Sequence, residues 1–123
     1  MANDVMLSLC AMEGKQAALN AGVAIEDQLK AAMNATANHW MVLDEDTQFR
    51  GAIAGVLLVA EERGDTETQE RLTHEVQLLR GLSALLAGVP VDAEQLVAKT
   101  EDGPKPLGLI KLWRHVKHGE SDA

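Results

Sequence analysis

Two histidines near the carboxyl end of the chain have the spacing of metal ligands. His115 and His118 are three residues apart, so a helix would carry both imidazoles on one face. The nearest candidate for a third ligand is Glu120, which lies in a polar tail, and several side chains close to the histidines are cationic. We therefore expect solvent-facing histidines, with no bound metal ion and no other cofactor.

Other motifs that could carry catalysis are incomplete. His74 and Glu75 begin like the helical zinc-protease motif, but Leu78 stands where the second histidine is required. The Glu-x-x-His pairs of di-iron bundles do not occur, because the residue three before His74 is Arg71. No serine has the flanking glycines of a nucleophile elbow, and no glycine-rich phosphate loop is present. The sequence predicts a protein that is not an enzyme.

Composition favours helices and disfavours contact with nucleic acids. The chain has 123 residues, which suits one domain, and its common residues are strong helix formers such as Ala, Leu, Met, Gln and Glu. The net charge is −8, which repels phosphate backbones. One Phe, two Trp and no Tyr leave few platforms on which bases could stack. We expect an all-α domain that does not bind DNA or RNA directly.

The expected location is the cytoplasm of a bacterium or of a virus-infected host cell. Cys10 is the single cysteine and cannot form a disulfide within the chain; we expect it to be a buried structural thiol. The first residues lack the positive charge of a signal peptide. The longest apolar run is about half of the roughly twenty residues that a membrane span needs. No membrane association is expected.

The run Phe49–Gly64 is the predicted core helix. From Gly51 to Ala60 it contains no polar side chain, which is typical of a helix surrounded by other helices. Gly51 and Gly55 form a smooth strip on this helix, and we expect the small residues of 31–37 in the preceding helix to pack against it. A glycine inside a helix costs about 1 kcal/mol relative to alanine, and close helix packing is the usual reason for it.

The core helix and the helix after it are predicted to form an antiparallel hairpin at the centre of the fold. Phe49–Arg63 and Thr66–Leu86 are separated by a tight turn, and Thr66 with Gln69 has the pattern of a capping box. The second helix carries a heptad of leucines, which is more typical of a bundle core than of a dimer seam. These leucines are Leu72, Leu79 and Leu86.

With the remaining helices, the sequence predicts a compact bundle of five to six helices. The bundle is expected to be a single domain, residues 1–118, followed by a polar tail, residues 119–123. In the first helix we expect large apolar side chains to face the core. These are Val5, Leu9, Met12 and Leu19. A second helix is expected over residues 24–40 and a short one after Asp92, and the prolines and glycine of residues 101–106 must break the chain.

The last predicted helix, Leu107–Lys117, differs from the rest in charge. Residues 1–103 hold 7 basic and 17 acidic side chains, whereas residues 104–123 hold 4 basic and 2 acidic ones. This basic amphipathic helix packs either on its own bundle or, as a separately docking segment over 104–118, on a partner. An aromatic residue beside an arginine is typical of binding hot spots. The predicted partner-binding residues are Leu109, Lys111, Trp113, Arg114 and Lys117.

The function most consistent with these features is that of a small acidic adaptor or inhibitor that binds a larger protein. In one alternative, the acidic surface mimics nucleic acid and blocks a DNA- or RNA-binding machine, as small anti-defence proteins of phages and plasmids do. Its acidic face would comprise Asp44, Glu45, Asp46, Glu61, Glu62, Asp65, Glu67 and Glu70. In a second alternative, the leucine heptad and the glycine strip build a homodimer.

Overall fold

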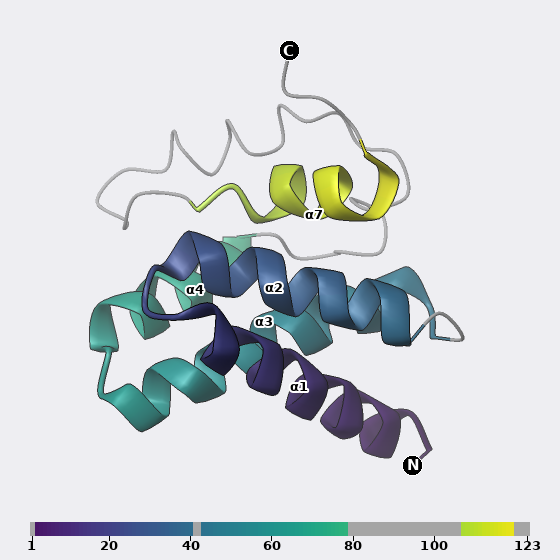
Figure 1. Ribbon diagram of the computed structural model, residues 1–123, viewed down its shortest axis with the longest axis horizontal. Helices are drawn as coiled ribbons and strands as arrows, with labels where there is room; N and C mark the ends of the chain where they lie inside the picture. The colour runs from purple at the N-terminus through teal and green to yellow at the C-terminus, as the bar shows by residue number, and fades with distance from the viewer. Residues whose placement is uncertain (1, 41–42, 79–106, 120–123) are drawn as a thin grey trace.

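The computed structural model describes residues 2–40, 43–78 and 107–119, and every regular element in them is a helix. The all-α prediction is therefore confirmed. Figure 1 shows the helices packed against one another, with α7 beside α2 at one edge of the bundle. The helices are α1 (Ala2–Ala21), α2 (Ile25–His39), α3 (Glu45–Arg63), α4 (Thr66–Leu78) and α7 (Leu109–His118).

α3 is the central element, as its apolar sequence predicts. It packs against α1, α2 and α4, while α7 packs on α2. Figure 1 shows α1 and α7 on opposite sides of α2. Phe49, Ile53 and Val56 of α3 join a core to which every described helix contributes. Its other large members are Leu29, Met33, Val59, Leu72, Leu109, Ile110 and Trp113.

The hairpin of α3 and α4 is present in the described part of the chain. Gly64 ends α3 in the left-handed conformation, with φ of 68°, and its N–H donates back to the carbonyls of Ala60 and Glu61. The cap of α4 is not the predicted Thr66. Asp65 accepts hydrogen bonds from the backbone N–H and the hydroxyl of Thr68, at 3.1 and 2.6 Å.

Several predicted features lie outside the described residues. They include the second half of the helix predicted to end at Leu86, with Leu79 and Leu86 of its heptad, and the short helix after Asp92. The break at residues 101–106 and the tail from residue 120 onward also lie outside. In the parts that are described, no helix is long and apolar enough to cross a membrane.

The glycine strip of α3 faces α1, and the prediction that it faces α2 is wrong. A Cβ atom added to Gly55 would lie 2.4 Å from the backbone nitrogen of Lys15 and 2.6 Å from the carbonyl carbon of Gly14. A Cβ on Gly51 would lie 2.5 Å from the sulfur of Cys10. The two backbones therefore approach so closely that glycine is required, which explains two glycines in a core helix.

The predicted orientation of α1 is also wrong. Val5, Leu9 and Met12 are exposed to 59, 46 and 63%, while the residues that face the bundle are small. The reason is the close approach to α3: side chains the size of leucine do not fit between backbones at this distance. Of the predicted inner stripe, Leu19 is partly buried against the core. The buried face of α1 consists of Cys10, Ala11, Gly14 and Ala18.

Candidate functional site

Trp113 lies at the centre of the contact between α7 and the rest of the bundle. Its side chain is fully buried and meets the ring of Phe49 edge to face, with centroids 5.4 Å apart and an interplanar angle of 74°. The indole N–H donates to Oε1 of Glu45 at 2.9 Å. Leu109 and Ile110 are also fully buried. Of the two predicted packings of the last helix, the structure shows the one on its own bundle.

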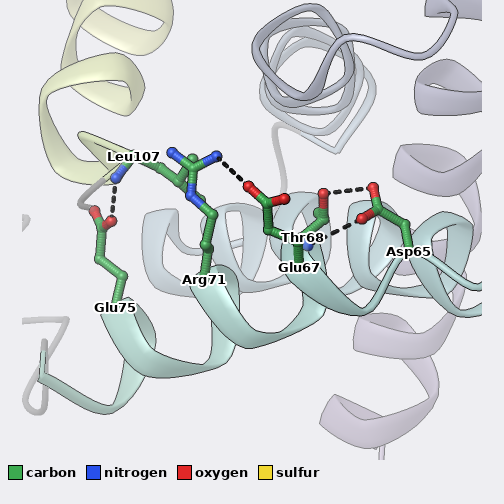
Figure 2. Close-up of polar contacts among 6 residues, drawn as sticks. All are labelled: Asp65, Glu67, Thr68, Arg71, Glu75 and Leu107. Atoms are coloured by element: carbon green, nitrogen blue, oxygen red, sulfur yellow. Dashed lines mark hydrogen bonds and ion pairs between the residues drawn. The ribbon is translucent and has the colours of Figure 1, made fainter. Parts of the chain in front are cut away.

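Glu75 fixes the beginning of α7. This carboxylate is 1% exposed, and it accepts the backbone N–H of Leu107 and, at 2.9 Å, that of Leu109. Figure 2 shows Glu75 reaching from α4 to Leu107. The first amide groups of a helix have no acceptor within the helix, and a negative charge is favourable there. Glu75 therefore acts as a cap supplied by another helix.

A second polar contact fixes the other end of α7. The ammonium group of Lys117 donates to Oε1 of Gln48 at 2.7 Å, and Nε2 of Gln48 donates to the carbonyl of Trp40 at 2.7 Å. Gln48 is fully buried, so its Oε1 would lose the hydrogen bond from Lys117 if α7 moved away. α7 is thus held at both ends by polar contacts and in its middle by an aromatic one.

The five residues predicted to bind a partner are therefore used mainly within the molecule. Trp113 and Leu109 are in the core, Arg114 is 8% exposed, and Lys117 is half-buried. Lys111 is the exposed member of the five. The role of these residues in binding another protein stays a prediction, and a partner would reach Trp113 only after α7 had lifted.

The eight predicted acidic-face residues form two groups at opposite ends of α3. Asp44, Glu45 and Asp46 lie at its beginning, and the other five lie at its end and in α4. Asp46 and Glu61 are 15 residues apart in α3, so the groups are separated by about 22 Å along the helix. They do not build one continuous surface.

Many of these carboxylates have local partners. Asp46 pairs with Arg50, Glu62 with Lys15 and Glu67 with Arg71, all across exposed or partly exposed surface. Such pairs contribute little to stability, at most about 1 kcal/mol each. They also neutralise part of the charge that a nucleic-acid mimic would present.

Two of the aspartates act as helix caps, and this changes their titration. Oδ1 of Asp44 accepts the backbone N–H of Thr47 at 2.8 Å, which lowers the pKa of Asp44. The pKa of Asp65 is lowered by its hydrogen bonds from the hydroxyl and then the N–H of Thr68. Both groups are therefore held in the charged form that caps a helix start.

The exposed apolar surface of α1 is a feature that our sequence analysis missed. We call Val5, Leu9 and Met12 the α1 outer face; their spacing of four and three residues aligns them along one side of the helix. That side is opposite Cys10 and Gly14, which are buried. The signal in the sequence was a second stripe in α1, made of small residues, that matches the glycine strip of α3.

Metal binding and thiol chemistry are the two other kinds of site to consider among the described residues. Among them, no group of three His, Cys, Asp or Glu side chains is placed to hold a metal ion. Burial, with a smaller contribution from Glu13, raises the pKa of Cys10 to about 11, so its thiol is a poor nucleophile at neutral pH. The prediction that Cys10 is buried is confirmed.

Comparisons with known proteins add no relative. No protein-family model, no curated protein and no solved structure matches the chain. Function must therefore be inferred from the surfaces described above.

Proposed function

We propose that the protein is a helical protein-binding module that inserts the α1 outer face into an apolar groove of a larger protein. The supporting observation is the exposure of Val5, Leu9 and Met12 by 59, 46 and 63% on the side of α1 that points away from its own core. Apolar anchors at i, i+4 and i+7 are the pattern by which a helix docks in a groove.

A groove fits this surface better than a second copy of the same helix. Stable interfaces bury about 800 Å² on each partner, and three side chains in a line supply only part of that area. Two copies pairing along the α1 outer face would touch little else. A groove encloses a helix from three sides and would also cover the partly exposed Met6. A larger partner therefore fits the area of this surface better than a second copy does.

The packing behind α1 suits a docking role. A Cβ added to Gly14 would lie 3.1 Å from the carbonyl oxygen of Gly51, and one on Gly55 would overlap the backbone of α1. Such close contact leaves α1 little freedom to shift on α3. A rigid, preformed helix loses less conformational entropy when it binds.

The test is site-specific cross-linking followed by a direct measurement of affinity. A photo-reactive residue at position 12 should cross-link the partner in the native host, and the cross-link should map to a groove lined by apolar side chains. Leu9→Lys should then weaken binding to the purified partner by about 30-fold or more, because a charge would enter the groove. The matched control is Val23→Lys, at an 83% exposed position between α1 and α2, which should bind normally.

Two results would contradict the proposal. One is a Leu9→Lys variant that binds the partner as tightly as the Val23→Lys control. The other is a wild-type chain that sediments as a dimer at micromolar concentration while Leu9→Lys sediments as a monomer. The second result would assign the α1 outer face to self-association.

A further inference from the structure

A cleft lies on the opposite side of α2 from α1, and its lining combines apolar and positively charged side chains in an otherwise acidic protein. It lies between the first turns of α2 and α7, beside Arg71 of α4, and has a volume of about 390 Å³. This size is within the range of small-molecule sites. Its apolar lining comes from Ile25, Leu29, Leu107 and Leu112.

The charged groups around the cleft are mainly positive, in a protein whose net charge is −8. Lys30, Arg71 and Lys111 line it together with His115, against one acidic residue, Glu26. Three of the 11 lysines and arginines of the chain thus gather here. A concentration of positive charge beside an apolar surface attracts anions that carry an apolar portion.

Two ion pairs at this cleft can be exchanged for contacts with a ligand. Lys30 pairs with Glu26 at 3.1 Å, and the Glu26 side chain is 73% exposed. Arg71 pairs with Glu67 at 3.9 Å, and the Glu67 side chain is 81% exposed, whereas that of Arg71 is only 22% exposed. Figure 2 shows Arg71 extending from α4 towards the segment that begins α7. Exposed pairs of this kind are weak, so a ligand anion can compete with both carboxylates.

The side chains, and not the helix start, would hold the anion. Glu75 already accepts the N–H groups of Leu107 and Leu109, so these amides at the start of α7 are occupied. The cationic side chains that line the cleft are Lys30, Arg71 and Lys111, with His115 beside them and Glu26 as the one acidic member. An arginine is suited to two-point contact with a carboxylate or a phosphate.

We infer that this cleft binds a small amphipathic anion, a carboxylate or phosphate monoester whose apolar body lies against Ile25 and Leu112. The anionic head contacts Lys30, Arg71 and Lys111, and the apolar body replaces water over the floor of the cleft. This site is separate from the α1 outer face and does not depend on the protein-binding function.

The experiment is an amide NMR titration of the full chain with four probes, the two amphipathic anions kept below their critical micelle concentrations. Octanoate and octyl phosphate test the two head groups, inorganic phosphate tests the charge alone, and octanol tests the apolar body alone. The two amphipathic anions should bind saturably and shift the signals of Ile25, Lys30 and the first turn of α7. Inorganic phosphate and octanol should each bind at least about tenfold more weakly.

Variants that replace a lysine of the cleft by the neutral glutamine test whether these side chains bind the anion. Lys30→Gln and Lys111→Gln remove one exposed charge each, and the double variant should weaken binding by about tenfold. Arg50→Gln is the control, because it removes one exposed cation from α3 and does not line this cleft. Its affinity for octyl phosphate should equal that of the wild type.

Each other outcome overturns the inference. No saturable shift with either amphipathic anion would show that the cleft is not a site for this class. Equal affinity for octyl phosphate and inorganic phosphate would remove the role of the apolar lining. Equal loss in Arg50→Gln and in the single variants Lys30→Gln and Lys111→Gln, which each remove one charge, would show a general effect of net charge.

Discussion

The α1–α3 contact and the α7 contact are built in different ways. Between α1 and α3 the residues are small, the backbones nearly touch, and Gly55 leaves no room for a methyl group. Between α7 and the bundle the residues are large, and the contact includes the buried polar side chains of Glu75 and Gln48. The first contact depends mainly on shape, with one surface ion pair between Lys15 and Glu62, whereas the second depends on both shape and buried polar groups. Mutations should therefore damage the two contacts through different mechanisms.

The largest effect is expected from Gly55→Ala. The added methyl group would lie 2.4 Å from a backbone nitrogen of α1, so α1 would have to move away from α3. Although alanine favours a helix by about 1 kcal/mol, we expect a net loss of about 3 kcal/mol in the free energy of unfolding, measured in urea.

The control for this change is Gly64→Ala. Gly64 has φ of 68° and open space around its Cβ position, so alanine there meets only backbone strain, which costs about 1 kcal/mol. If Gly55→Ala proved more stable than Gly64→Ala, the close contact between α1 and α3 would be refuted.

The next effect concerns the charge at the beginning of α7. Glu75→Gln keeps the shape but replaces an acceptor of two N–H groups by an amide, so one buried N–H loses its acceptor. We expect a loss of about 2 kcal/mol in the free energy of unfolding, together with a change in tryptophan fluorescence as Trp113 becomes less restrained. Glu70→Gln, exposed on the same helix, should stay within about 0.5 kcal/mol of the wild type. Equal stability of the two variants would remove Glu75 as an anchor.

A smaller effect is expected at the cap of α4 and should depend on pH. Because the pKa of Asp65 is lower in the folded state than its ordinary value of 3.8, its charge stabilises the fold above that value. The contribution is lost as the pH falls through the folded pKa. Asp65→Ala should cost about 1 kcal/mol at pH 7, and this difference from the wild type should shrink below pH 3.8.

Thr66→Ala separates the two possible caps. Thr66 was the cap predicted from the sequence, but in the structure Asp65 makes the capping hydrogen bonds. Thr66→Ala should therefore change the urea midpoint at pH 7 much less than Asp65→Ala does. The reverse order would restore the prediction from the sequence.

The difference between the α1–α3 contact and the α7 contact also explains which parts of the fold could be predicted from the sequence. The apolar run of α3 and the turn at Gly64 are local signals, and together they correctly placed α3 at the centre of the fold, in a hairpin with α4. For α1, the apolar pattern predicted that the largest apolar residues face the core. That assignment failed because the distance between backbones, set by Gly51 and Gly55, decides which side chains fit.

The contacts of α7 show a second limit. The amphipathic pattern predicted an inner side with Leu109 and Trp113, but it could not choose between the bundle and a partner. In the sequence, Glu75 stood out only as part of an incomplete zinc motif. Its capping role could not be predicted, because its partners Leu107 and Leu109 are more than thirty residues further along the chain. Contacts over such a distance leave no periodic signal in one sequence.

The most direct test of the account is the stability of a chain with lysine at both Leu9 and Met12. Both positions are exposed in the structure, so Leu9→Lys with Met12→Lys should keep the free energy of unfolding within about 0.5 kcal/mol of the wild type. If α1 instead buried its large residues, as the sequence pattern alone suggested, two unpaired charges would enter the core. A loss of several kcal/mol in urea unfolding would contradict the orientation of α1 and the docking function proposed for its outer face.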